Sequence, residues 1–274
     1  MVPEAQLLER DGTIQEISGH RSLLLNDPTM IWVVLDGEGE VVSTDVLDSH
    51  ATGRRQFISN TKSGEILFSI QDEDSPANHA VMLLAQETLR VIELPKEHLE
   101  YVAESMRVSA VTAIQAWSSK IISLLDPGSV PSSCQRLKTG DNLVMSPGHQ
   151  VEPISDTGLW VRLSQGRGTF VGTESVFEQD DLLLLPSGSW LEASEELQIE
   201  TLDSTQVSIE GSLAALQRLN RWIQVKRELF RNQELSSNSE RVYQRDLVEK
   251  KESERALSKL ASVLNPQSTP IGQG

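Results

Sequence analysis

The sequence predicts a mainly β protein with long helices, in which two small β-barrels are joined by a helix and followed by a C-terminal helical segment. Short β-branched and apolar runs, separated by turn residues, fill residues 19–95 and return in residues 134–210. Several short strands at such spacing are typical of a small sandwich or barrel. Between and after these regions, at 96–125 and 212–264, apolar residues follow the three-and-four spacing of a helical face.

The charge of the chain is strongly acidic and unevenly distributed. The 274 residues include 24 Lys+Arg and 40 Asp+Glu, which gives a formal net charge of −16. Residues 1–211 carry 13 basic and 33 acidic side chains, a balance of −20, whereas residues 212–274 carry 11 and 7, a balance of +4. Affinity for nucleic acid depends on Lys and Arg meeting phosphates, so we expect no nucleic-acid partner.

Cysteine usage and hydropathy indicate a reducing compartment and no membrane span. The single cysteine, Cys134, excludes a disulfide framework and a four-cysteine zinc site. A membrane-spanning helix needs roughly 20 consecutive apolar residues, and the longest apolar runs, Ala80–Ala85 and Ile31–Leu35, have the length of strands. The first residues lack the basic and apolar regions of a signal peptide, so we expect a cytoplasmic protein.

The first barrel is expected at residues 19–95, after a short amphipathic N-terminal segment at 1–18. The run Ile31–Leu35 is β-branched and aromatic, as strands prefer. The Gly-rich turn Asp36–Gly39 and a second run at Glu40–Val46 follow it, which is the pattern of a hairpin. Further strands are expected at Gln56–Ser59, Ile66–Ser69, Ala80–Leu84 and Thr88–Glu93.

A connecting helix is expected at residues 96–128, and a second, cupin-like β-barrel is expected at residues 134–210. Proline at the first turn and Asp126-Pro127-Gly128 at the end are start and stop signals for the helix. The second barrel repeats the pattern of the first, with a tryptophan inside a β-run (Trp32 and Trp160), a glycine turn and further strands. We interpret the two as a tandem repeat of one architecture. Strands are expected at Leu143–Met145, Leu159–Leu163, Thr169–Val171, Asp181–Leu185, Ser189–Ala193 and Leu197–Leu202.

The segment 212–264 is expected to be helical, and residues 265–274 to be a linker. The first part of the helical segment has a heptad-like seam with polar breaks, so a dimer through helices 212–264 is expected as a partner arrangement. The seam residues are Leu213, Leu216, Asn220, Ile223, Arg227 and Phe230. A charged helix, Glu240–Leu264, completes the segment.

Sequence motifs of common enzymes are absent. The phosphate loop, GxSxG, HExxH and CxxC do not occur, and Gly166-Arg-Gly168 departs from the dinucleotide-binding pattern. We therefore expect no catalytic residue, no enzyme activity and no cofactor. A metal-dependent cupin enzyme that uses His149 and Glu152 is a further hypothesis. A metal site needs three or four converging ligands, and a surface turn after Pro147-Gly148 explains the same residues, so we expect no metal.

One short segment resembles the phosphate cassette of cyclic-nucleotide-binding domains. Ser63-Gly-Glu-Ile-Leu-Phe68 matches the strand and turn that open the cassette, with Gly64 and Glu65 at the family's Gly-Glu pair. In that family the glutamate takes the ribose hydroxyl, and an arginine further along pairs with the cyclic phosphate. Here Asn78-His79-Ala80 stands at the family's Arg-x-Ala, and asparagine cannot supply the permanent charge of a guanidinium. Two interpretations follow: Gly64, Glu65, Asn78 and His79 bind a ligand, or Glu65 makes a structural hydrogen bond in the barrel.

Five stretches of the chain together resemble a known family. They are Ser22-Leu-Leu-Leu-Asn-Asp-Pro28, Ile31-Trp-Val-Val34 with Gly37 and Gly39, Gly64-Glu-Ile-Leu-Phe68, Gly158-Leu-Trp-Val161 with Gly166 and Gly168, and the charged helix Glu240–Leu264. The family is the NHLM/NHLP-type bacteriocin export ABC transporter, and the chain resembles the N-terminal cytosolic region of its permease/ATPase subunit. The resemblance covers nearly all of residues 15–264 and implies tandem cyclic-nucleotide-binding-like or cupin-like domains.

This resemblance implies a role without catalysis in the chain itself. In the family, a membrane domain and an ATPase domain follow this region and export leader-bearing peptides. The chain would be a regulatory or cargo-docking module at the inner face of the plasma membrane. Its partners would be the transmembrane and ATPase domains of the exporter and the leader-bearing peptide cargo. The alternative is a cyclic-nucleotide or small-molecule sensor with a degenerate phosphate cassette.

Overall fold

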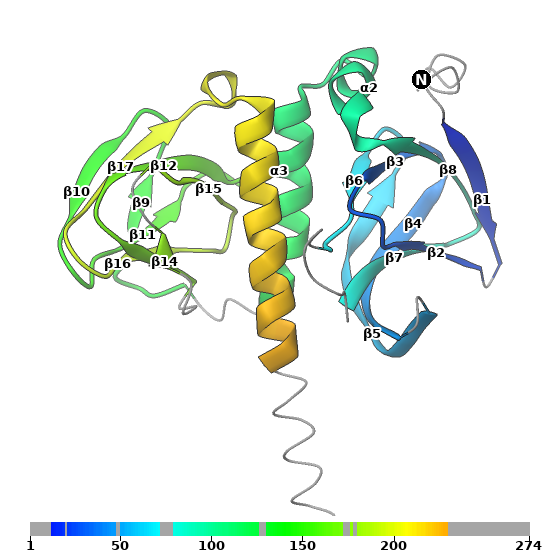
Figure 1. Ribbon diagram of the computed structural model, residues 1–274, viewed down its shortest axis with the longest axis horizontal. Coiled ribbons are helices and arrows are strands. Elements are labelled where there is room, and N and C mark those ends of the chain that lie inside the picture. The colour runs from blue at the N-terminus through cyan, green and yellow to red at the C-terminus, as the bar shows by residue number, and fades with distance from the viewer. Residues whose placement is uncertain are drawn as a thin grey trace, which may run out of the picture. The chain divides into compact units, whose positions relative to one another are not determined.

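The computed structural model describes residues 12–19, 21–47, 50–71, 79–125, 130–171, 176–177 and 180–229. Within these residues the predicted fold class is confirmed, because the protein is mainly β, with helices between and after two β units (Figure 1). We call residues 13–95 the first β unit and residues 135–202 the second β unit. The described residues up to Arg227 belong to one compact unit.

The first β unit consists of two four-stranded antiparallel sheets, with the orders β1-β8-β3-β6 and β2-β7-β4-β5. Its strands are β1 (Thr13–Ser18), β2 (Ser22–Leu25), β3 (Met30–Asp36), β4 (Glu38–Leu47), β5 (His50–Lys62), β6 (Ile66–Phe68), β7 (His79–Ala85) and β8 (Thr88–Pro95). β1 lies in the segment predicted as an amphipathic N-terminal piece. It pairs along its whole length with β8, at the far end of the unit, and this long-range pairing makes it a strand.

The second β unit repeats the topology of the first. Its sheets have the orders β10-β17-β12-β15 and β14-β13-β16-β11-β9. Adding nine to each strand number of the first unit reproduces both orders, and β9 is an extra strand parallel to β11. The predicted tandem repeat is therefore confirmed. The strands are β9 (Gln135–Leu137), β10 (Asn142–Met145), β11 (Gln150–Pro153), β12 (Leu159–Gln165), β13 (Gly168–Phe170), β14 (Val176–Phe177), β15 (Leu182–Leu185), β16 (Leu191–Ala193) and β17 (Leu197–Leu202).

An equivalent glycine turn is present in both units. Gly37, between β3 and β4, has a φ of +90°, and a Cβ atom there would lie 2.2 Å from the carbonyl oxygen of Thr88. Gly166, between β12 and β13, has a φ of +85°, and a Cβ atom there would lie 2.0 Å from the carbonyl oxygen of Glu196. Thr88 and Glu196 both stand where the last strand of their unit begins. Glycine is therefore required at both turns, by backbone conformation and by space.

The helix predicted between the two units is bent. Its parts are η1 (Lys96–His98), α2 (Leu99–Ser105), α3 (Ala110–Ile121) and η2 (Ile122–Leu125). Arg107 has a left-handed φ of 60° and ends the first helix. Ser109 then begins α3, because its side chain accepts a hydrogen bond from the Thr112 amide. After η3 (Ser204–Gln206), residues 209–229 form a last helix, which we call the C-terminal helix.

Among the described residues, no single helix has both the length and the apolar composition that crossing a membrane requires. The bent pair Lys96–Ser105 and Ala110–Leu125, with 107° between its halves, meets the test only when the two are taken together. This is a statement of length and composition alone.

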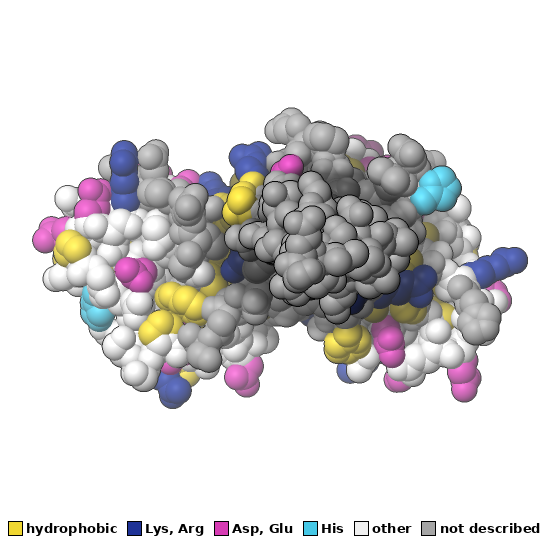
Figure 2. All heavy atoms as spheres, turned by 90° about the horizontal axis from the view of Figure 1, so that it is seen from below, with side chains coloured by type: hydrophobic (Ala, Val, Ile, Leu, Met, Phe, Trp, Pro, Cys, Tyr) yellow, Lys and Arg dark blue, Asp and Glu magenta, His cyan; other side chains and the backbone are white. Residues whose placement is uncertain are grey.

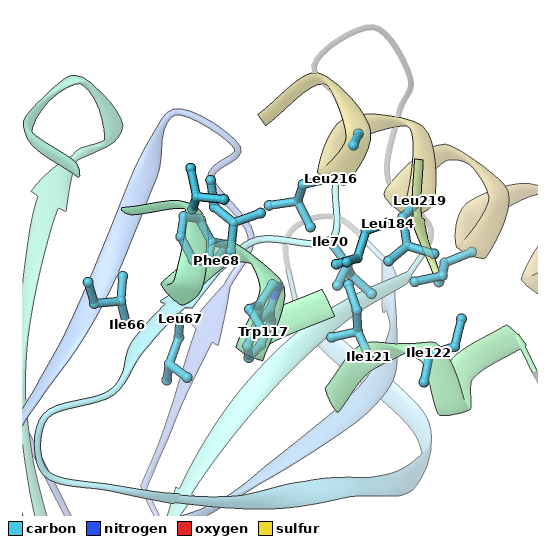
Figure 3. Packing of buried hydrophobic residues seen from close by; sticks show 14 of the residues in the cluster. Ile66, Leu67, Phe68, Ile70, Trp117, Ile121, Ile122, Leu184, Leu216 and Leu219 are labelled. Atoms are coloured by element: carbon cyan, nitrogen blue, oxygen red, sulfur yellow. The ribbon is translucent and has the colours of Figure 1, made fainter. Parts of the chain in front are cut away.

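The hydrophobic core continues from the strands into both helices. Figure 3 shows Trp117 of α3 close to Phe68 at the end of β6, with Ile121 of α3 and Leu216 of the C-terminal helix in the same cluster. Trp117 is 1 % exposed, and its ring centroid lies 6.5 Å from that of Phe68. The two helices therefore complete the core of the β units.

Three residues of the seam predicted to form a dimer are buried within the chain, and Leu213 and Arg227 are half-buried. Leu216, Asn220 and Ile223 are 5 %, 4 % and 0 % exposed. The charged helix Glu240–Leu264 and Phe230 lie outside the described residues. A dimer through 212–264 therefore stays a prediction, and its described seam residues already have partners in this chain.

The surface shown in Figure 2 carries acidic and basic side chains in small separate groups. Large hydrophobic side chains that are more than half exposed include Phe57 on β5 and Val144 on β10, and Val225 and Leu229, which lie four residues apart on the C-terminal helix. Single exposed hydrophobic side chains such as Phe57 and Val144 are ordinary for a protein surface.

Candidate functional site

Gly64 and Glu65 form the turn between β5 and β6. The turn is fixed against β3 by two main-chain hydrogen bonds. The amide of Gly64 donates to the Val34 carbonyl at 2.8 Å, and the amide of Val34 donates to the Glu65 carbonyl at 3.0 Å. Gly64 has a φ of 91°, a conformation that favours glycine. The backbone at Glu65 is therefore set by the sheet.

The carboxylate of Glu65 is bonded by two groups of the protein. Thr61 Oγ1 donates to Glu65 Oε2 at 2.8 Å, and Lys120 Nζ forms an ion pair with the same oxygen. Lys120 lies in the last turn of α3 and also donates to the carbonyl of Asn60 at 3.0 Å. The side chains of Lys120 and Glu65 are only 22 % and 27 % exposed. These are contacts of the structural kind, and a ligand-binding role for Glu65 stays a prediction.

A cavity of about 150 Å³ lies beside this ion pair. Glu65 and Lys120 form its polar end, and Ile66, Leu67 and Trp117 contribute apolar walls. The indole Nε1 of Trp117 is buried and has no hydrogen-bond partner among the described residues. The cavity is thus mostly apolar, with one ion pair in its lining.

The second β unit holds a carboxylate in the equivalent turn. The amide of Leu163 donates to the Asp181 carbonyl at 3.0 Å, and the amide of Asp180 donates to the Leu163 carbonyl at 2.7 Å. These are the bonds that Val34 makes with Gly64-Glu65 in the first unit. Asp180 has a left-handed φ of 68°, as Gly64 has. Asp181 is therefore the counterpart of Glu65.

Both carboxylates pair with a base on the helix that follows their unit. Arg218, on the C-terminal helix, donates to Asp181 Oδ1 at 2.8 Å, and it also donates to the Leu182 carbonyl at 2.8 Å. In the first unit, Lys120 of α3 takes this role with Glu65. Each helix is thus tied to the turn that precedes the same strand of its own unit, β6 or β15.

α3 follows the first β unit but also bonds to the second. Gln115 Nε2 donates to the Gly158 carbonyl at 3.0 Å, and Trp160 Nε1 donates to Gln115 Oε1 at 3.1 Å. Ser119 Oγ donates to the Thr157 carbonyl at 2.9 Å. One helix therefore bonds both units.

The C-terminal helix follows the second β unit but also bonds to the first. Asn220 Nδ2 donates to the Ser69 carbonyl at 3.0 Å, from a residue that is 4 % exposed. Gln224 Nε2 donates to the carbonyls of Ile70 and His79, both at 3.0 Å. The carbonyls of Ser69 and Ile70 directly follow the first stretch that resembles a phosphate cassette, Ser63–Phe68. The carbonyl of His79 belongs to the second stretch, Asn78-His79-Ala80. Asn78, one of the predicted site residues, lies outside the described residues.

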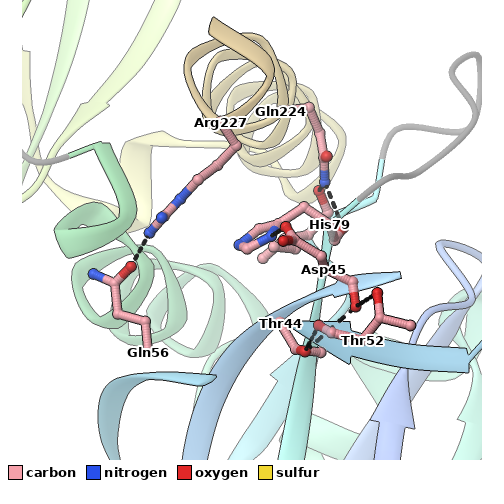
Figure 4. A network of polar contacts seen from close by, with 8 residues as sticks. Thr44, Asp45, Thr52, Gln56, His79, Gln224 and Arg227 are labelled. Carbon is pink, nitrogen blue, oxygen red and sulfur yellow. Dashed lines mark hydrogen bonds and ion pairs between the residues drawn. The ribbon is translucent and has the colours of Figure 1, made fainter. Parts of the chain in front are cut away.

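His79 is buried at the start of β7, in a different set of contacts from Glu65 (Figure 4). Its Nδ1 lies 3.2 Å from Oδ1 of Asp45, its cross-strand neighbour on β4, and its Nε2 is buried without a hydrogen-bond partner among the described residues. Arg227 of the C-terminal helix bonds Gln56 of β5 nearby. Burial lowers the pKa of His79, and the charge of Arg227 lowers it further, whereas the hydrogen bond and charge of Asp45 raise it.

This lowered pKa predicts a loss of stability on acidification. Because the pKa of His79 in the folded chain lies below its ordinary value of 6.5, the unfolded chain binds more protons as the pH falls through that value. The free energy of unfolding is expected to drop by up to about 1.4 kcal/mol per pH unit over that range. Urea unfolding at about pH 7.5 and about pH 5.5 measures it, and His79→Gln should show a smaller drop. An equal drop in that variant would remove His79 as the cause.

The residues of the metal hypothesis do not converge. His149 lies in a turn, where its amide donates to the Ser146 carbonyl at 3.0 Å, and Glu152 accepts a hydrogen bond from Arg136 at 3.2 Å. Within the described part of the chain, no group of three or more His, Cys, Asp and Glu side chains is placed to hold a metal ion. The pKa of the Cys134 thiol is raised by burial and by nearby carboxylates, which disfavours the reactive thiolate.

Sequence reasoning found Glu65 but missed Lys120, Asp181 and Arg218. No sequence signal marked Asp181, because the two units differ in length between the turns Gly37–Gly39 and Gly166–Gly168 and this position. Only the matching main-chain hydrogen bonds show that Asp181 corresponds to Glu65. The helix bases carried no signal either, because a basic residue on an amphipathic helix is ordinarily solvated.

Comparisons with known proteins show similarity of fold alone. No family model matches this chain, and no curated protein matches it. The cAMP-bound PfPKA-R structure is 13 % identical, covers 80 % of this chain and 80 % of its own, and has a TM-score of 0.28. The regulatory domain of Toxoplasma gondii PKA with cAMP is 11 % identical, covers 78 % and 85 %, and has a TM-score of 0.25. The heme domain of CooA from Carboxydothermus hydrogenoformans is 10 % identical, covers 44 % and 82 %, and has a TM-score of 0.30. These similarities are distant, and none of the comparisons identifies a sequence family or supports the exporter.

Proposed function

We propose that this chain is a non-catalytic regulatory module that responds to a small molecule through its helices. The responsive site is the cavity beside the Glu65–Lys120 pair, which has α3 as one of its walls. A molecule that enters the cavity and moves α3 would act on both β units, because α3 bonds to both. The C-terminal helix, which also bonds to both, would carry the change to the rest of the chain.

The observation that carries this proposal is the reciprocal bonding of the two helices. α3 is paired with its own unit through Lys120 and bonds the other unit through Gln115 and Ser119. The C-terminal helix is paired with its own unit through Arg218 and bonds the other unit through Asn220 and Gln224. Neither helix can shift on its own unit without changing contacts on the other. Such an arrangement suits a protein that transmits a conformational change from one β unit to the other, rather than an enzyme.

Lys120→Met tests this transmission without any ligand. The substitution keeps the length of the side chain and removes its charge, so the Glu65 carboxylate loses its partner. We expect amide hydrogen exchange to rise on the order of tenfold in α3 and also in residues 157–160 of the second unit, since α3 holds that turn. Exchange mass spectrometry of the full chain resolves both segments.

The matched control is Arg218→Met, which breaks the equivalent pair of the second unit. It should raise exchange in the C-terminal helix and at Ser69–Ile70, across the chain from the substitution. If Lys120→Met changes exchange only within α3 and the first unit, the helices do not couple the units, and the proposed function is wrong.

The exporter context is a finer form of the same proposal. It would make the regulated partner the transmembrane and ATPase domains, and the effector a leader-bearing peptide. Its support is the resemblance of residues 15–264 together with a C-terminal helix bonded to both units. Adding a leader-bearing peptide to the exchange experiment tests it, since unchanged exchange at high concentrations of both removes the peptide as effector.

A further inference from the structure

We infer that the cavity beside Glu65 takes a neutral molecule of about the size of one ring, carrying a hydroxyl group. This rests on the proposed function, because it names the chemical class of the molecule that would occupy the same site. Three properties of the cavity support it: its volume, the charge balance of its ion pair and its apolar walls.

The volume sets the size of the occupant. A cavity of about 150 Å³ is the size that holds a single benzene ring in an engineered protein core. A purine, a ribose and a phosphate together are much larger than one ring. A cyclic nucleotide would therefore protrude from the cavity, and would be enclosed only if α3 moved away from β6, which would separate Trp117 from Phe68.

The ion pair at the end of the cavity sets the charge of the occupant. Glu65 and Lys120 neutralise each other and are each about three-quarters shielded from solvent. A charged molecule would add a third, unpaired charge to a partly desolvated place, which is costly. A hydroxyl group avoids this cost because it donates to a carboxylate and accepts from an ammonium at the same time.

The indole of Trp117 serves as the reporter of such an occupant. Its ring is among the residues that line the cavity, and its side chain is 1 % exposed. Its Nε1 is fully buried, so a molecule in the cavity changes the surroundings of the ring without bonding to this N–H.

The remaining walls are mostly apolar, and the cavity is open to solvent. Ile66, Leu67 and Ala113 line it, and so do the exposed residues Val108, Thr112 and Ala116. An aromatic or aliphatic ring gains free energy by leaving water for such walls. The combination selects a phenol-like or cyclic-alcohol molecule over a sugar or a phosphate.

The experiment uses phenol as the probe and the full chain labelled with nitrogen-15. Titration is followed at the indole N–H resonance of Trp117, assigned by its loss in Trp117→Phe. We expect a saturable shift with phenol, at least tenfold weaker binding of benzene, and no saturable shift with cyclic AMP. Saturation by benzene at equal strength would overturn the hydroxyl, and saturation by cyclic AMP without phenol would overturn the size and charge.

The matched variants are Ala113→Leu, which fills the cavity, and Ala214→Leu, an equal change at an exposed position of the C-terminal helix. Ala113→Leu should weaken phenol binding at least tenfold, and Ala214→Leu should leave it unchanged. Equal binding by both variants, or no saturable shift in the unmodified chain, would overturn the proposed site. Neither result affects the hydrogen-exchange test of Lys120→Met, because that test contains no ligand. The proposed regulatory function and the proposed ligand class can therefore be contradicted separately.

Discussion

Replacing Trp117 with alanine is expected to lower the free energy of unfolding by about 3–5 kcal/mol. The side chain is 1 % exposed, packs against Phe68 and closes the cavity between α3 and β6. Removing it joins the space of the indole to a cavity of about 150 Å³, so the surrounding side chains cannot fill the gap. Urea unfolding measures the change as a lower midpoint at constant slope.

Trp117→Phe is the matched control for this prediction. It keeps an aromatic ring against Phe68 and loses part of the volume, so it should cost clearly less than alanine. The indole N–H has no partner to lose among the described residues, and therefore no hydrogen-bond penalty is expected. Equal destabilisation by both variants would contradict this account, since it would mean that packing volume is not what Trp117 contributes.

Replacing Gly37 with alanine is expected to have the second largest effect. Gly37 has a φ of +90°, and left-handed backbone costs an L-residue about 1–2 kcal/mol. The new Cβ atom would also lie 2.2 Å from the Thr88 carbonyl oxygen, at the start of β8. Relieving this overlap requires the backbone to shift, which adds about 1–3 kcal/mol.

Gly140→Ala separates the two contributions. Gly140 has a similar φ of +86°, but a Cβ atom there meets nothing within 4 Å. It should therefore show only the cost of the backbone conformation, and urea unfolding of both variants gives the cost of the overlap as the difference. Equal effects of the two substitutions would show that the approach of Gly37 to β8 does not matter.

The parts of the fold that local patterns specify were predictable from the sequence. The strands on either side of Gly37 and the strand Leu197–Leu202 follow from alternating or continuous apolar runs between turn residues. The predicted hairpin around Gly37 is wrong, because β3 and β4 lie in different sheets and pair with other strands. β1 was not predictable, because its pairing with β8 is a long-range contact that a short polar-apolar segment does not announce. The bend between α2 and α3 was hidden for a related reason. Arg107 takes a conformation that glycine usually marks, while apolar spacing continues on both sides.

The candidate site was predictable only in half. Glu65 belongs to a motif and was identified, whereas Lys120 comes from a helix that packs on it from a distant part of the sequence. A motif describes one stretch of the chain, whereas an ion pair joins residues from two stretches that can be far apart in the sequence. His79 was also singled out, and its contacts with Asp45 and Gln224 depend on strand register and helix placement that one sequence does not contain.

The repeated order of strands has a consequence for what the molecule can measure. Heat, salt or denaturant would change the stability of both units, which share one topology. A molecule bound in one unit would change the stability of that unit alone. Helices attached to both would respond mainly to the difference between the halves, and a change common to both would cancel. The unit containing Asp181 and Arg218 would then serve as the reference against which a change in the unit containing Glu65 and Lys120 is compared.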